Sequence, residues 1–258
     1  MRFLVAVKQV PDTSAMRVDA DGNLVRQGVP SILDPYCETA LCRILDTRVP
    51  GDEVAVFTMG PPQAESCLRR CLDLGADRAF LITDRDLGGS DTWATARAVS
   101  AFVERHCPDA DLLVFGRQTI DGGTGQVPYE VAQLLDRQQF AYVTDLSIGD
   151  GGIEATQDYG DSLRRCKVPV RSVVSFGEVD LKGRLCSIAD HIRAGERSVV
   201  KIDRVGLGLG VYSVGLKGST TRIEGTSVVK GERKCRKVRI ENPDRAVELI
   251  FDMVGVKG

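Results

Sequence analysis

Short apolar runs alternate along this chain with longer stretches in which apolar residues recur at helical spacing. Because such alternation is typical of strand–helix–strand crossovers, the sequence predicts an α/β fold with a doubly wound, mainly parallel sheet. The predicted strands are residues 3–10, 53–59, 78–82, 112–115 and 168–176. The predicted helices are residues 38–47, 63–74, 92–106 and 128–135.

The pattern changes near residue 200, beyond which glycines recur without helical periodicity. Residues 219–238 are rich in Thr, Arg and Lys and are predicted to form an extended arm. A last amphipathic helix, residues 243–253, places Val247, Ile250 and Phe251 on one face, which needs a covering surface. We therefore expect an α/β domain at residues 1–200, followed by an arm and short helix at 201–258 that pack on another subunit.

Composition and charge narrow the choice of function. The chain is 43% hydrophobic, which is enough for a sizeable core, and its net charge of −2 argues against a broad nucleic-acid-binding face. The first apolar run is interrupted at Lys8, so it is too short for a signal sequence or a membrane span. We expect a soluble protein without a membrane span, cytoplasmic in a bacterium or archaeon.

Eight cysteines invite a metal or disulfide interpretation, but no two of them are spaced as Cys-x-x-Cys. Cys67 and Cys71 could share a helix face, yet two thiols do not complete a tetrahedral site, and His106 and His191 add no ligand pair. Reduced, mostly buried thiols are the favoured interpretation, with a redox or metal role as the alternative. No Gly-x-Ser-x-Gly motif occurs, so the sequence predicts neither a metal site nor a catalytic residue.

Three segments leave the carboxyl ends of predicted strands, where open parallel sheets bind ligands. They are residues 6–12, residues 59–62 and the glycine loop, which we define as residues 116–127. Gly122, Gly123 and Gly125 let the backbone approach a ligand, and their amides precede a helix, a favourable place for phosphate. Asp121 could accept a hydrogen bond from a ribose hydroxyl or cap the turn. The alternative is a tight turn without a ligand.

Other polar residues have two interpretations each. Residues 88–92 are predicted to cap a helix through Ser90 and Asp91, with contact to a cofactor as the alternative. Lys8 and Arg117 could steady phosphates or a reduced flavin, or they could be solvated surface charges.

Taken together, these segments resemble the β subunit of electron-transferring flavoproteins over nearly the whole chain. The similarity lies in residues 7–13 (VKQVPDT), 59–65 (MGPPQAE), 75–79 (GADRA), 90–95 (SDTWAT), 116–122 (GRQTIDG) and 215–221 (GLKGSTT). The resemblance implies a Rossmann-like domain that binds an adenine nucleotide and pairs with a larger α-type subunit carrying FAD. In this family the β subunit holds either structural AMP or a second FAD.

Residues 26–32 and 34–36 resemble the electron-bifurcating and nitrogen-fixation-associated branch of the family. The resemblance then implies FAD in this chain, NADH as the electron donor, and ferredoxin and a second acceptor as destinations. A simple electron carrier with AMP is the alternative, so whether the chain takes part in an enzyme is left open. A stand-alone nucleotide-binding regulatory module is a third hypothesis, which the glycine-rich arm disfavours.

The resemblance also implies the residues of the site. The expected cofactor contacts are Ala6, Val7, Lys8, Asp34, Pro35, Tyr36, Cys37, Met59, Gly60, Asp91, Thr92, Gly116, Arg117, Gln118, Thr119, Ile120, Asp121, Gly122, Gly123, Thr124, Gly125, Gln126 and Val127.

The chain departs from the family pattern in three places. Gly123 stands where Asp is usual, Pro128-Tyr129 replaces Gly-Pro, and residues 180–188 lack the usual Asn-x-Pro-Arg-Tyr. By spacing, Ile188 would be the apolar anchor for a partner flavoprotein dehydrogenase or quinone reductase, or alternatively a core residue.

Overall fold

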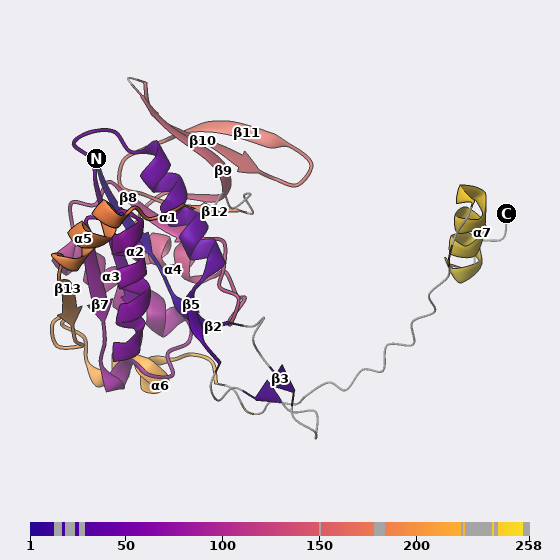
Figure 1. Cartoon of the computed structure of the whole chain (residues 1–258). Coiled ribbons are helices and arrows are strands. Elements are labelled where there is room, and N and C mark those ends of the chain that lie inside the picture. Colours follow the sequence, from indigo (N-terminus) through magenta and orange to yellow (C-terminus); the bar gives the residue numbers. More distant parts are fainter. Residues whose placement is uncertain are drawn as a thin grey trace.

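The computed structural model describes residues 1–12, 17–18, 24–25, 29–149, 151–177, 184–222, 224, 239 and 242–254. Within these residues, nine strands form one sheet in the order β11-β10-β9-β12-β8-β1-β6-β7-β13 (Figure 1). Its strands are β1 (Arg2–Ala6), β6 (Glu53–Met59), β7 (Arg78–Ile82), β8 (Leu112–Gly116), β9 (Gln139–Gly149), β10 (Gly152–Asp158), β11 (Leu163–Val168), β12 (Ser172–Phe176) and β13 (Val199–Ile202).

All neighbours from β9 to β13 in this order run parallel, and only β10 and β11 add antiparallel pairs at one edge. Shorter strands lie outside the large sheet and form two separate pairs. They are β2 (Gln9–Pro11), β3 (Arg17–Val18), β4 (Leu24–Val25) and β5 (Ser31–Leu33). The mainly parallel α/β fold is therefore confirmed.

Helices cover both faces of the sheet (Figure 1). The helices in the described residues are α1 (Pro35–Thr47), α2 (Glu65–Leu74), α3 (Thr92–His106), α4 (Val127–Leu134), α5 (Ile188–Gly195), α6 (Gly215–Gly218) and α7 (Pro243–Val254), with the short 3-10 turns η2 (Pro62–Ala64), η3 (Arg85–Leu87) and η4 (Val211–Ser213). Residues of α1 and α2 pack on one face of the sheet, and residues of α3 and α4 pack on the other.

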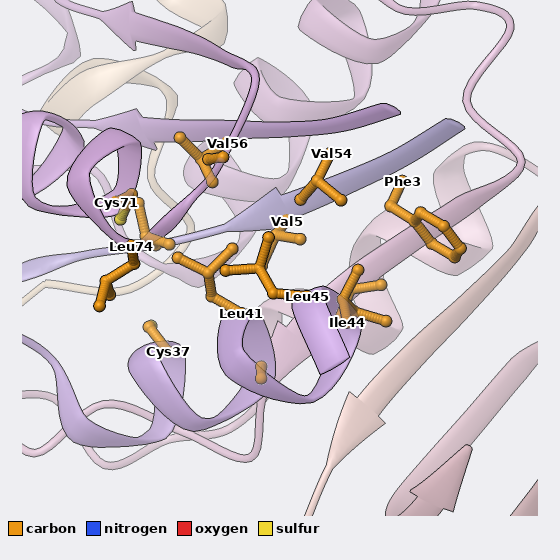
Figure 2. Packing of buried hydrophobic residues seen from close by; sticks show 14 of the residues in the cluster. Phe3, Val5, Cys37, Leu41, Ile44, Leu45, Val54, Val56, Cys71 and Leu74 are labelled. Carbon is orange, nitrogen blue, oxygen red and sulfur yellow. The ribbon is translucent and has the colours of Figure 1, made fainter. Parts of the chain in front are cut away.

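Successive strand residues point to opposite faces, which gives the molecule two cores. Phe3 and Val5 of β1 pack with Leu41 and Ile44 of α1, as Figure 2 shows. Leu4, between them in sequence, packs into the other core, which includes residues of α3 and α4. The central strands β1, β6, β7, β8 and β12 are buried on both faces, so they read as continuous apolar runs. The doubly wound prediction is confirmed by these two clusters.

Several predicted elements are confirmed within a residue or two. The observed β6, β7 and α3 have the predicted bounds, and β8 is longer by one residue. The predicted helix 38–47 begins earlier, at Pro35, because Asp34 caps it. Residues 63–74 form η2 and α2 rather than one continuous helix. The predicted helix 128–135 is α4, shifted by one residue.

Two predicted strands are each divided. Residues 3–10 form β1 and β2, because the chain leaves the large sheet after Ala6 and β2 pairs antiparallel with β5. Residues 168–176 hold the end of β11 and all of β12, separated by a turn at Pro169–Arg171 in which Arg171 has φ of 64°. In both cases the apolar run continues across the break, so periodicity alone predicts one strand where the structure has two.

The region after residue 200 agrees only in part with its prediction. The boundary predicted at residue 200 falls inside β13, which pairs with β7, so the packed body continues beyond it. Most of the predicted arm, 219–238, lies outside the described residues. The last helix is confirmed as α7, and Val247, Ile250 and Phe251 are all exposed on it.

Candidate functional site

The candidate site lies where the order of strands in the sheet reverses. β1 has β6 on one side and β8 on the other, so the chain runs outward through β6 and β7 and then returns across β1 to β8. Open α/β sheets bind ligands in the crevice beyond the carboxyl ends of the strands at such a point. The glycine loop follows β8 directly, and Lys8 follows β1. The two segments therefore lie together at this edge of the sheet, and their contact with a ligand stays a prediction.

An ion pair joins the two segments across this point. Lys8 Nζ lies 2.8 Å from Asp121 Oδ2, and both side chains are partly exposed. Burial opposes ionisation of Asp121, but hydrogen bonds from Lys8, Thr119 and Gly122 and the charge of Lys8 lower its pKa. Lys8 therefore fixes a carboxylate at the mouth of the loop.

Asp34 ties the glycine loop to the start of α1. Its side chain is fully buried, and its Oδ1 accepts hydrogen bonds from the amides of Tyr36 (3.0 Å) and Cys37 (3.3 Å). Its Oδ2 accepts from the amide of Ile120 in the loop at 2.8 Å. Burial raises the pKa of Asp34, and these backbone hydrogen bonds offset part of that rise. The Asp34 carboxylate thus caps α1 and also accepts a hydrogen bond from an amide of the glycine loop.

The loop and α1 approach each other too closely for a side chain at Gly116. A Cβ atom there would lie 2.7 Å from the carbonyl carbon and 2.8 Å from the carbonyl oxygen of Tyr36. Glycine at the end of β8 is therefore required by this contact between backbones.

Two other loop glycines have left-handed conformations, Gly123 with φ of 64° and Gly125 with φ of 63°. Gly123 also donates to the carbonyl of Thr119 at 2.8 Å, which closes the turn. Among the described residues, none accepts a hydrogen bond from the amides of Thr124, Gly125 or Gln126, which lead into α4. Amides ahead of a helix favour an anion, so this part of the loop has the chemistry of a phosphate cradle.

The other predicted contacts lie along the same edge of the sheet or beside it. Ala6 ends β1 and Val7 follows it, and the Val7 amide donates to the carbonyl of Phe57 in β6 at 2.9 Å. Met59 ends β6, and the Gly60 amide donates to Ile82 at 3.0 Å. Pro35 and Cys37 lie in the first turn of α1, and Gln118 in the glycine loop. The contact of these residues with a cofactor stays a prediction.

Two predicted residues have environments that limit their chemistry. Cys37 is buried, and burial and the nearby Asp34 carboxylate raise the pKa of its thiol well above the usual value, so it is uncharged. The Arg117 guanidinium carbon lies 5.7 Å from the centre of the Tyr142 ring, so Arg117 turns toward β9.

Asp91 and Thr92 mark the start of α3, as the capping interpretation predicted. Asp91 Oδ1 accepts from the amide of Ala94 at 2.9 Å, and its Oδ2 accepts from Thr220 and Thr221. Burial opposes ionisation, but these hydrogen bonds lower the pKa of Asp91 to about 2. Donors from this chain thus already bind both oxygens of the Asp91 carboxylate. Contact between Asp91 and a cofactor stays a prediction.

Glu130, in the first turn of α4, lies beside the predicted residue Thr92 and is not among the residues predicted from the sequence. Thr92 Oγ1 donates to Glu130 Oε1 at 3.0 Å, while Oε2 is buried and has no hydrogen-bond partner among the described residues. Burial and the neighbouring Asp91 charge raise the pKa of Glu130. Acidic residues are common in the first turn of any helix, so no sequence pattern distinguishes Glu130 from an ordinary first-turn residue.

Ile188, the predicted partner anchor, is the first residue of α5 and is 82% exposed. It is therefore not a core residue. Leu185 and Ile192 are also exposed beside it in sequence, so the three form an apolar segment on the surface.

Other kinds of site find no support in the described part of the chain. No group of three His, Cys, Asp or Glu side chains there is arranged to hold a metal ion. The seven cysteines described are free thiols, and Cys235 lies outside the described residues. No helix described here has the length and apolar character needed to cross a membrane.

Comparisons with known proteins agree with this geometry. A family model described as "Electron transfer flavoprotein domain" matches residues 21–174, which include the glycine loop. The chain is 40% identical to the electron transfer flavoprotein subunit beta of Thermoanaerobacterium thermosaccharolyticum, over 90% of each chain. It is 37% identical to the caffeyl-CoA reductase-Etf complex subunit CarD of Acetobacterium woodii, over 86% of each chain. It is also 37% identical to the protein FixA of Azotobacter vinelandii, over 95% of this chain and 89% of that one.

Proposed function

Because the chain belongs to the electron transfer flavoprotein family as a β-type subunit, we propose that it binds FAD at the glycine loop and pairs with an α-type subunit. In this proposal the complex takes electrons from NADH and divides them between ferredoxin and a second acceptor. The acceptor is a flavoprotein dehydrogenase or a quinone reductase.

One observation carries the nucleotide part of the proposal. The amides of Thr124, Gly125 and Gln126 point to no acceptor within the described residues, and they precede α4 beside the switch point of the sheet. A phosphate group supplies the acceptors that these donors need. The backbone of the loop can come close to such a group because it carries glycine at 122, 123 and 125. The residues present therefore fit the diphosphate of a dinucleotide.

FAD, when bound, can accept a hydride from NADH and release its electrons one at a time. The chain's own residues bind and orient it. Asp34 holds the loop against α1, and Lys8 holds Asp121 where its carboxylate can accept from a ribose hydroxyl. With Gly123 in place of the usual Asp, the backbone donors carry more of the binding than they do in the family pattern.

Two lines of support favour FAD over AMP. Residues 26–36 resemble the electron-bifurcating branch, and of these the structure describes 29–36, where β5 leads into Asp34 and α1. Residues 26–28 lie outside the described residues. The relatives also include CarD, named as a subunit of a complex with a reductase. AMP is the second candidate, because the same phosphate cradle suits either nucleotide.

The exposed segment of Leu185, Ile188 and Ile192 supports the docking part of the proposal. Apolar side chains grouped on a surface are typical of protein–protein contacts. We assign this segment to the dehydrogenase or reductase partner, and the exposed face of α7 to the α-type subunit.

The cofactor content of the purified complex tests the proposal. We expect about two flavins for each pair of subunits and no stoichiometric AMP, because each subunit then holds one FAD. One flavin together with one AMP would show that this chain is a simple electron-carrier subunit. Isolation of the chain as a stable, flavin-free monomer would contradict the pairing itself.

A further inference from the structure

Residues 215–221 are hydrogen-bonded to residues 88–92, the segment that leads into α3. The amide of Leu216 donates to the carbonyl of Gly88 at 3.1 Å, and the amide of Gly215 donates to Ser90 Oγ at 3.0 Å. Ser219 Oγ accepts from the amide of Asp91 at 2.8 Å. The segments 88–92 and 215–221, which are far apart in sequence, therefore hold each other in place through hydrogen bonds.

Asp91 makes the strongest part of this attachment. Its Oδ2 accepts from the amide and hydroxyl of Thr220 at 2.7 and 3.0 Å, and from the amide and hydroxyl of Thr221 at 2.8 and 3.1 Å. Hydrogen bonds to an ionised acceptor are roughly twice as strong as neutral ones. Capping α3 requires only the bond from Ala94 to Oδ1. The second oxygen is therefore devoted to Thr220 and Thr221.

The path into this attachment is also closely packed. Gly215 has φ of 61°, and a Cβ atom on it would lie 2.0 Å from the carbonyl oxygen of Asp86. A Cβ atom on Gly218 would lie 2.3 Å from the carbonyl carbon of Ser213. The backbone therefore leaves no room for a side chain at either position, and glycine is required at both.

We propose that Asp91 is a positioning residue that fixes Thr220 and Thr221 on the α/β body and so sets the point from which the chain continues toward α7. With Thr220 and Thr221 held, α7 is tethered from a fixed point, and its apolar residues Val247, Ile250 and Phe251 reach the partner subunit at lower entropic cost. This second step rests on the proposed function, because it takes the α-type subunit as the surface that covers α7.

Hydrogen exchange in the purified complex separates this role from helix capping. Asp91→Ser keeps one oxygen to cap α3 but has no second oxygen for the threonines. We expect the amides of Thr220 and Thr221 to exchange about tenfold faster in this variant, while the amide of Ala94 stays protected. Asp91→Ala should expose all three amides. Unchanged exchange at Thr220 and Thr221 in both variants would overturn the proposal.

Asp84→Asn is the matched control. Asp84 also caps a turn, accepting from Asp86 at 3.0 Å, and ties it to a later segment through the amide of Arg204 at 3.2 Å. Its replacement should leave Thr220 and Thr221 protected. Equal acceleration in Asp84→Asn would show general loosening of this edge and would overturn the specific role of Asp91.

The assembly step is tested by diluting the complexes. We expect Asp91→Ser to raise the dissociation constant of the subunit pair about tenfold, because the tether is no longer ordered before binding. An unchanged constant would overturn the positioning role in assembly. If the wild-type chain forms no flavin-containing pair, the proposed function has failed instead, and the two failures are thereby distinguished.

Discussion

Replacing Gly116 with alanine is expected to lower the free energy of unfolding by about 2–4 kcal/mol, at the upper end of overpacking effects. The added Cβ would lie within 3 Å of the backbone and Cβ of Tyr36, and no flexible side chain there can move aside. Relief requires the start of α1 to separate from the glycine loop, which also strains the bond from Ile120 to Asp34. Urea denaturation of the full-length chain measures this loss.

Gly122→Ala is the control for this substitution. It lies in the same loop, but a Cβ there meets only Thr119 Oγ1, at 3.6 Å, an ordinary contact. Its cost should stay within about 1 kcal/mol. Equal losses in the two variants would mean that any change in the loop is destabilising and that the contact with Tyr36 has no special part.

Asp34→Ala is expected to cost about 2–4 kcal/mol, since it removes a helix cap and leaves a loop amide without an acceptor. Asp34 is fully buried, so water does not replace the lost acceptor for Ile120. Asp84→Ala removes an aspartate that likewise caps a turn and accepts from a distant amide, that of Arg204, but Asp84 is less buried than Asp34, so water can replace it and the loss should be about 1 kcal/mol. If the two losses were equal, burial of the link between α1 and the loop would add nothing to its contribution.

The pH dependence of stability gives an independent check on Asp34. Because burial raises its pKa in the folded chain, the folded state holds this proton more tightly than the unfolded state does. The contribution of Asp34 is therefore fully present below its unfolded pKa of about 3.9 and is lost as pH rises through the folded value. The difference in stability between wild type and Asp34→Ala should shrink over that interval. A difference that grows with pH there would contradict the assigned direction.

The parallel part of the sheet could be predicted because its strands are apolar on both faces. β6 and β7 read as short continuous apolar runs, and burial on both faces is the physical reason. The strands at the other edge, β9, β10 and β11, are not predicted. Exposed residues are interspersed with buried ones along them, and a polar, weakly alternating pattern does not distinguish a strand from a loop.

Two further elements were missed for different reasons. α5 has a capping box formed by Ser187 and Asp190 and carries Ile188 and Ile192 one turn apart, but eight residues are too few for this spacing to distinguish a helix from a loop. β13 adds one strand to the sheet edge beside β7, and two of its four residues are exposed. A four-residue edge strand buries too few apolar side chains to show a recognisable pattern of apolar residues in the sequence.

The place of the candidate site could be predicted, but its internal bonding could not. Sequence order alone placed Lys8 and the glycine loop at neighbouring carboxyl ends of strands, because parallel strands share that edge. That Lys8 pairs with Asp121, and that Asp34 reaches Ile120, depends on contacts between residues 113 and 86 positions apart. The role of Asp91 toward Thr220 depends on a separation of 129 positions. No local pattern encodes such pairs.

The central claim is that the glycine loop holds the flavin nucleotide of this chain, and the flavin content of a Gly125→Ala complex tests it most directly. Gly125 has φ of 63°, and a Cβ there would lie 3.1 Å from the carbonyl oxygen of Arg117, so the variant displaces the amides assigned to phosphate. Gly160→Ala imposes a similar left-handed strain, at φ of 87°, in the turn between β10 and β11. We expect about one flavin for each pair of subunits in Gly125→Ala and about two in Gly160→Ala, because only the first variant alters the loop amides that hold phosphate. Two flavins in both variants would contradict the claim.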